Sequence, residues 1–168
     1  MQKSLDDFEG KESIFIDANI FLHHAFDSNN NAVKFLEKVE LFQVKAYTSA
    51  LVMEEVAFKL LMQSASSFLK IVTMQNVKRF LLSNKRRDEI FKPVIEYREY
   101  IDLLKKFGLI ILDLTDKDIA NAINNAKRYG LILADSTHLT VMERKGITNI
   151  ATSDYDFKKI DNITLWVP

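Results

Sequence analysis

The chain lacks cysteine and contains little glycine or proline. The absence of cysteine excludes disulfide bonds, a thiol nucleophile and thiolate zinc ligands, and it leaves the redox compartment undetermined. Only four glycines and two prolines interrupt the 168 residues, which favours long helices and short strands. A chain of this length can bury a sizeable apolar core, so we expect a single domain over residues 1–168.

Long apolar runs and an excess of one charge are also missing. No segment has the length and hydrophobicity of a membrane-spanning helix, and residues 1–12 lack the apolar stretch of a signal peptide. We therefore expect a cytoplasmic protein with no membrane association. The 23 basic and 23 acidic residues give a net charge of zero, so binding to nucleic acid would need a local basic surface.

One basic stretch could provide such a surface. Its members are Lys78, Arg79, Lys85, Arg86, Arg87 and Lys92. A solvated helix face is the alternative explanation, because charged runs are common on exposed helices.

Short apolar segments predict five strands. Residues 13–16 and 109–112 are apolar on both faces, which is typical of strands buried in a parallel sheet. Residues 46–48, 147–151 and 163–167 complete the set. Helical patterns alternate with these strands, and this alternation indicates an α/β fold with a parallel sheet.

The helical patterns include one unusually long stretch. Residues at about 63–108 have helical spacing of apolar side chains, and Pro93 is expected to begin a new helix because proline suits the first turn. Thr115 and Asp118 resemble a capping box at the start of a later helix.

Acidic residues stand at the ends of apolar segments in four separate parts of the chain. They are Asp17, Glu55, Asp135 and Asp154. A carboxylate in apolar surroundings is costly unless its charge is compensated. Mg²⁺ prefers oxygen ligands, so the set suggests a site for such a cation. In parallel sheets ligands bind beyond the carboxyl ends of the strands, and this would bring Asp17, Asp135 and Asp154 together.

Each acid taken alone has a simpler explanation. Asp17 could cap the helix that follows it. Glu55 could be an exposed helix residue beside Glu54, and Asp154 could be a turn residue. Asp135 is harder to dismiss, because its neighbours one turn before and after are leucines.

Four motifs resemble those of the PIN-domain ribonucleases, a family that includes VapC-type toxins. They are three apolar residues before D-x-N at 14–19, T-S-x(5)-E-V at 48–56, A-D-S-T-H-L at 134–139 and T-x-D-x-D-F at 152–157. Their order and spacing agree with the family, and the last is the most distinctive. The resemblance implies a three-layer α/β/α fold with a central parallel sheet of about five short strands.

The resemblance also implies roles for individual residues. The catalytic acids would be Asp17, Glu55, Asp135 and Asp154. Of these, Asp17, Asp135 and Asp154 would bind Mg²⁺ or Mn²⁺, and Asn19, Thr152 and Asp156 would be supporting polar residues. Glu55 is preferred to Glu54 because the family's glutamate stands six residues after the serine.

The implied activity is metal-dependent hydrolysis of RNA phosphodiester bonds. Lys85, Arg86 and Arg87 are expected to contact the RNA backbone, and Tyr155 is the aromatic residue placed to meet a nucleotide. His23, His24 and His138 are interpreted as ordinary helix or core residues, since metal-assisted hydrolysis needs no histidine.

Several alternatives stay open at this stage. The chain could be the toxin of a toxin–antitoxin pair with an antitoxin protein as partner, or an RNA-processing or ribosome-maturation nuclease, or a non-catalytic module that binds RNA or protein. The helical stretch at about 63–108 is longer than in compact VapC toxins, which puts the toxin role in question. A haloacid-dehalogenase-type phosphatase would need Asp where Asn19 stands. Family resemblance further suggests a homodimer.

Overall fold

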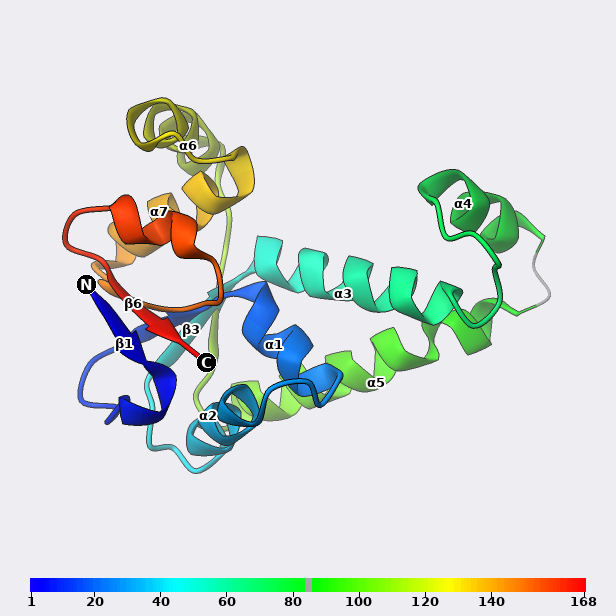
Figure 1. Ribbon diagram of the computed structural model, residues 1–168, viewed down its shortest axis with the longest axis horizontal. Coiled ribbons are helices and arrows are strands. Elements are labelled where there is room, and N and C mark those ends of the chain that lie inside the picture. The colour runs from blue at the N-terminus through cyan, green and yellow to red at the C-terminus, as the bar shows by residue number, and fades with distance from the viewer. Residues whose placement is uncertain (84–85) are drawn as a thin grey trace.

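A six-stranded parallel sheet forms the centre of the computed structural model, which describes residues 1–83 and 86–168. The strands lie in the order β1-β6-β5-β2-β3-β4. Their bounds are β1 Gln2–Ser4, β2 Ile14–Ile16, β3 Ala46–Ser49, β4 Ile110–Leu112, β5 Asn149–Ala151 and β6 Thr164–Val167. Helices cover both faces of the sheet, so the predicted three-layer α/β/α arrangement is confirmed (Figure 1).

Strand β2 lies near the middle of the sheet and is buried on both faces. Its Phe15 pairs with Tyr47 of β3 on one side and with Ile150 of β5 on the other. A strand surrounded in this way needs apolar residues at every position, and Ile14, Phe15 and Ile16 are all fully buried. The central strand is thus fixed by its own sequence.

The edges of the sheet differ from expectation. A sixth strand, β1, was not predicted, because its residues are polar and exposed and carry no apolar pattern. It is held by its register with β6, in which Lys3 lies opposite Trp166. At the other edge, the prediction that β4 is fully buried was wrong. Ile110 is 42% exposed, because an edge strand leaves part of its surface uncovered.

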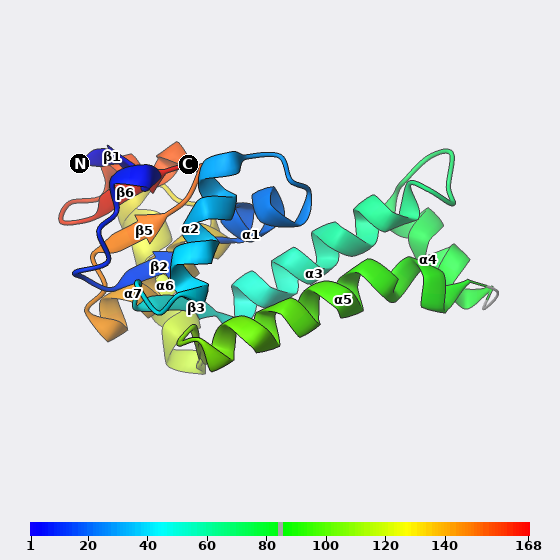
Figure 2. The same cartoon turned by 90° about the horizontal axis from the view of Figure 1, so that it is seen from below.

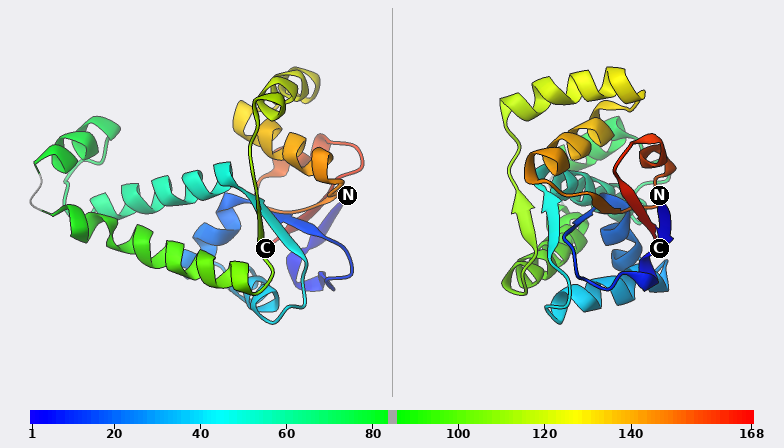
Figure 3. Two further views of the ribbon diagram at one scale, coloured as in Figure 1. Left: turned by 180° about the vertical axis from the view of Figure 1, so that it is seen from behind. Right: turned by 90° about the vertical axis from the view of Figure 1, so that its left-hand side faces the viewer.

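Seven α-helices and two short 3₁₀ helices connect the strands within the described residues. The bounds are η1 Leu5–Asp7, α1 Ala18–Ala25, α2 Asn30–Glu40, α3 Ala50–Ala65, α4 Met74–Leu82, α5 Arg87–Lys106, α6 Asp116–Tyr129, α7 Leu133–Lys145 and η2 Tyr155–Lys159. Helices α6 and α7 lie on one side of the sheet, and α1 and α2 lie on the other (Figure 3). Among the described residues, no helix is long and apolar enough to cross a membrane.

Residues 61–83 and 86–92 form a helical arm that projects from the body of the molecule (Figures 1 and 2). The arm comprises the end of α3, all of α4 and the start of α5. It has a small hydrophobic cluster of its own around Ala65, Val77 and Ile90, separate from the main core.

The prediction that Pro93 starts a helix was wrong. Helix α5 begins at Arg87 and runs through Pro93. Proline removes one backbone hydrogen bond from a helix interior. Ile90 before it is fully buried in the arm, and Tyr97 after it packs in the main core. Tertiary packing on both sides therefore keeps the helix continuous.

Candidate metal centre

Three central strands end at the same edge of the sheet, and two of them lead directly into predicted site residues. Asp17 follows β2, and Thr152 follows β5. Because β2 and β5 are adjacent and parallel, these two residues leave the sheet side by side. Strand β3, on the other side of β2, leads into α3 and thus toward Glu55.

Asp17 is both a helix cap and the most buried acid of the site. Its Oδ1 accepts a hydrogen bond of 2.7 Å from the amide of Ala18, so it caps α1 as the simpler explanation proposed. Its Oδ2 accepts a hydrogen bond of 2.6 Å from the Thr152 hydroxyl and another from the Asn19 amide. A carboxylate has about four acceptor positions, so Asp17 is oriented by these bonds and retains capacity for a ligand.

Asn19 and Thr152 tie the β2 and β5 loops together. Asn19 Nδ2 donates to Thr152 Oγ1 at 2.8 Å, and its Oδ1 accepts from the amide of Ser153 at 2.9 Å. The Thr152 hydroxyl also accepts from the amide of Asp154 at 2.9 Å. Two of the three residues predicted as polar supports, Asn19 and Thr152, thus contact the acids or their backbone, and they fix where Asp154 leaves the strand.

Asp135 of α7, Asp154 of the loop after β5 and Asp156 of η2 come together. Each offers a carboxylate oxygen, and these oxygens lie within 4.8 Å of one another. Asp135 stands in the first turn of α7, and Asp154 accepts a hydrogen bond of 2.8 Å from the amide of Asp156. The sequence assigned Asp156 a supporting place, but its carboxylate lies among those of the other two acids.

The electrostatics of the site join all five acids. Burial raises the pKa of Asp135 to about 6, and the negative charges of Asp154, Asp17, Asp156 and Glu55 add to this rise. We call these five residues the acidic cluster.

Asp17 shows the same tendency. Burial raises its pKa, although the hydrogen bonds from Thr152 and Ala18 act in the opposite direction. Burial thus raises the pKa of two carboxylates of the site, Asp17 and Asp135, and nearby negative charge adds to the rise.

Glu55 and Glu54 differ in their surroundings. Glu54 is exposed, whereas Glu55 is partly buried and acts on the pKa of Asp135. The Oε1 atom of Glu55 also lies 3.7 Å from Nζ of Lys59 on the next turn of α3. Glu55 is therefore the one of the pair that belongs with the four aspartates of the acidic cluster.

Histidines lie at the border of the site. His138 is buried, and its Nε2 is 3.9 Å from Asp17 Oδ1. Burial lowers the pKa of His138 to about 4, so the ring is neutral at pH 7 and this contact is not an ion pair. On α1, His23 Nε2 lies 3.1 Å from the hydroxyl of Ser153. This contact was not foreseen, because nothing in the sequence links a helix residue to a loop 130 positions away.

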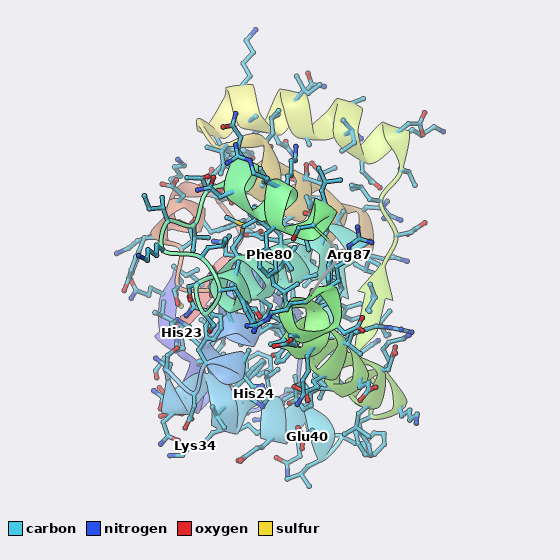
Figure 4. All side chains as sticks on the ribbon, turned by 90° about the vertical axis from the view of Figure 1, so that its right-hand side faces the viewer. His23, His24, Lys34, Glu40, Phe80 and Arg87 are labelled. Carbon is cyan, nitrogen blue, oxygen red and sulfur yellow. The ribbon has the colours of Figure 1, made fainter. Side chains whose placement is uncertain are left out.

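Among the described residues that were predicted to bind RNA, only Tyr155 stands beside the acids. Tyr155 is 57% exposed and stands between Asp154 and Asp156. Arg86 and Arg87 are exposed at the start of α5, in the arm that projects from the body (Figure 1), and Arg87 is labelled in Figure 4. Lys85 lies outside the described residues.

The donors of the acidic cluster suit a hard divalent cation. Mg²⁺ and Mn²⁺ are bound by carboxylate oxygens, and oxygen is what the three converging aspartates offer. The raised pKa of Asp135 supports the same fit, because a cation would relieve the repulsion among these groups.

Comparison with protein families places the chain in the PIN family. The PIN domain model matches residues 14–163, which is most of the chain. PIN domains are usually metal-dependent nucleases. Comparison with curated proteins gives no significant match.

Solved structures share the fold at low sequence identity. The VapBC2 complex from Rickettsia felis, bound to a DNA fragment from its promoter, contains a chain 15% identical with a TM-score of 0.56, covering 92% of this chain and 97% of its own. A toxin–antitoxin complex from Klebsiella pneumoniae gives 16% identity, a TM-score of 0.58 and coverage of 90% and 95%. The Mycobacterium tuberculosis toxin VapC20, which cleaves the sarcin-ricin loop, is 16% identical with a TM-score of 0.57. The match covers 87% of this chain and 93% of that chain.

Proposed function

We propose that the chain is an endoribonuclease that depends on Mg²⁺ or Mn²⁺ and hydrolyses RNA phosphodiester bonds at the acidic cluster. The observation that carries the proposal is the convergence of Asp135, Asp154 and Asp156 within 4.8 Å, beside a buried Asp17. Membership of the PIN family supports the same class of activity.

In this proposal Asp17, Asp135 and Asp154 hold the cation, and Asp156 is close enough to share it. When bound, such an ion would ease the deprotonation of a water molecule and offset the charge that develops on the phosphate. Thr152 and Asn19 keep the Asp17 carboxylate in one orientation through their hydrogen bonds. Partly buried Glu55 is the remaining acid of the cluster, and in this proposal it accepts a proton from the attacking water.

The test is cleavage of RNA with Mg²⁺ or Mn²⁺, and with excess chelator. Asp17→Asn and Asp135→Asn should each lower the rate by roughly 10²-fold or more, since both remove charge needed where the reaction takes place. Asp161→Asn is the matched control, because Asp161 is an exposed turn residue that lies outside the acidic cluster. Cleavage that persists in chelator, or in the Asp135 variant, would refute the proposal.

A toxin role is the more specific form of this function. The similarity in fold to toxins from toxin–antitoxin complexes supports it. In that role the protein would pair with an antitoxin and act as a homodimer. Expression of the parent should then arrest bacterial growth, whereas Asp135→Asn should not. An adjacent reading frame that encodes an antitoxin and restores growth would distinguish a toxin from an RNA-processing nuclease.

A further inference from the structure

The helical arm carries a charge opposite to that of the rest of the molecule. Residues 61–92 contain seven Lys and Arg but only two Asp and Glu, a net charge of +5. Because the whole chain is neutral, the remaining residues carry a net charge of −5. An RNA molecule that approaches the acidic cluster would therefore be repelled by the body and attracted by the arm.

Part of this positive charge is available to a ligand. Lys70, Lys78 and Arg79 are exposed, and none of them forms an ion pair with a residue in the described ranges.

The two described arginines that the sequence suggested are already engaged. Arg86 lies 3.7 Å from Glu89 and over the ring of Phe68, and Arg87 Nε donates to the carbonyl of Leu81. These contacts hold the arm's own structure, so the charges on and before α4 are the better candidates for binding.

The arm is packed well enough to hold these charges in place. Phe68 and Phe80 face each other with ring centroids 5.6 Å apart, and both pack against Ala65, Val77 and Ile90. A basic surface fixed on a packed element loses less conformational entropy on binding than a flexible tail would.

The length of α3 sets the distance between the acidic cluster and the arm. Helix α3 leads from Glu55 to the arm, and α4 rises from the same side of α3 as α6 and α7 (Figures 1 and 3). From Glu55 to Ala65 the helix advances about 15 Å, at 1.5 Å per residue. At a rise of roughly 3.4 Å per stacked nucleotide, this spans about four nucleotides or more.

We propose that the helical arm is a second RNA-binding surface, so that the preferred substrate is an RNA long enough to extend from the acidic cluster to α4. The inference rests on the proposed nuclease function and adds a requirement for substrate length. Contacts by Lys70, Lys78 and Arg79 would be to phosphates, which position an RNA without reading its sequence.

The test compares two triple variants of equal charge. The arm variant combines Lys70→Ala, Lys78→Ala and Arg79→Ala. The control variant combines Lys34→Ala, Lys45→Ala and Lys106→Ala, three exposed residues on the body, of which Lys34 is labelled in Figure 4. Thermal unfolding of both variants first establishes that each is folded.

RNA binding is then measured for both triple variants in an Asp135→Asn background, which prevents cleavage. The salt dependence of binding should flatten by about two log–log units in the arm variant, at roughly 0.7 units for each phosphate contact with a single strand. The control variant should keep the slope of its Asp135→Asn parent. Equal slopes in the two triple variants would overturn the proposal, and would leave the arm as a surface for a protein partner.

Cleavage gives a second, independent readout. The ratio of kcat/KM for an RNA of roughly twenty nucleotides to that for one of about four should fall in the arm variant, because only the longer RNA reaches α4. An unchanged ratio would overturn the proposal. If the parent cleaves neither RNA, the proposed function fails, while the binding comparison still decides whether the arm binds RNA.

Discussion

Removing the charge of Asp135 should stabilise the metal-free protein even though it abolishes cleavage. The side chain is partly buried, and no hydrogen bond to its carboxylate is found from the described residues. Burial makes its charge costly, and negative charge from Asp154, Asp17, Asp156 and Glu55 adds to that cost. Asn has nearly the same shape and no charge, so Asp135→Asn removes this repulsion without creating a cavity.

The size of the effect follows from the pKa of Asp135, which rises from an ordinary 3.8 to about 6. Each pKa unit corresponds to about 1.4 kcal/mol, which sets an upper limit of about 3 kcal/mol on the cost of its charge in the folded state. Solvent reaches part of the side chain and screens the repulsion, so we expect a gain of about 1–2 kcal/mol. In a chain of this length that corresponds to a melting temperature higher by roughly 3–6 °C.

The pH dependence fixes the sign of the prediction. Above pH 6 Asp135 is ionised in both the folded and the unfolded chain, and the cost of its charge is fully present. As the pH falls from 6 towards 4, the folded protein takes up a proton at Asp135 before the unfolded chain does. The advantage of Asp135→Asn should therefore be present at pH 7.5 and disappear near pH 4.

The assay is thermal unfolding of parent and variant in chelator and in Mg²⁺, with Asp161→Asn as the control. A cation that binds only the folded state stabilises it by about 2.7 kcal/mol at one hundred times its dissociation constant, and the variant should gain much less. If Asp135 instead held the fold together, its substitution would cost about 1–3 kcal/mol. A variant less stable than the parent in chelator would refute the assignment of Asp135 as a metal ligand.

Two further predictions concern the supports of the site and the fold. Thr152→Val removes the hydroxyl that donates to Asp17, so it should lower both RNA cleavage and the melting temperature, with a stability loss of about 1–3 kcal/mol. Thr152→Ser keeps a hydroxyl and should retain most of the parent's cleavage rate and melting temperature. A loss not restored by Ser would mean that the methyl group matters instead. Gly10→Ala should destabilise the fold more than Gly130→Ala does, as measured by chemical denaturation. Both glycines have a positive φ, so both substitutions strain the backbone. Only at Gly10 would the added Cβ also clash, because it would meet the Gln43 carbonyl oxygen at 2.0 Å, whereas nothing lies within 4 Å at Gly130. Equal losses would show that backbone conformation alone sets the cost.

The sequence determined the elements whose signals are local. Thr115 and Asp118 form the predicted capping box, and Gly130 ends α6 in the left-handed conformation that glycine adopts without penalty. The central strands were predictable because burial on both faces leaves an apolar run. Strand β1 was not, since its polar residues join the sheet only through pairing with β6.

The same division applies to the candidate site. Sequence motifs named the acids, and the expectation that ligands bind beyond the carboxyl ends of parallel strands predicted that Asp17, Asp135 and Asp154 would come together. Only the tertiary structure decided that Asp156 converges with Asp135 and Asp154, whereas the family motif had already favoured Glu55 over Glu54. A sequence motif records which residues are present, whereas the direction of a side chain depends on how elements distant in the chain pack together.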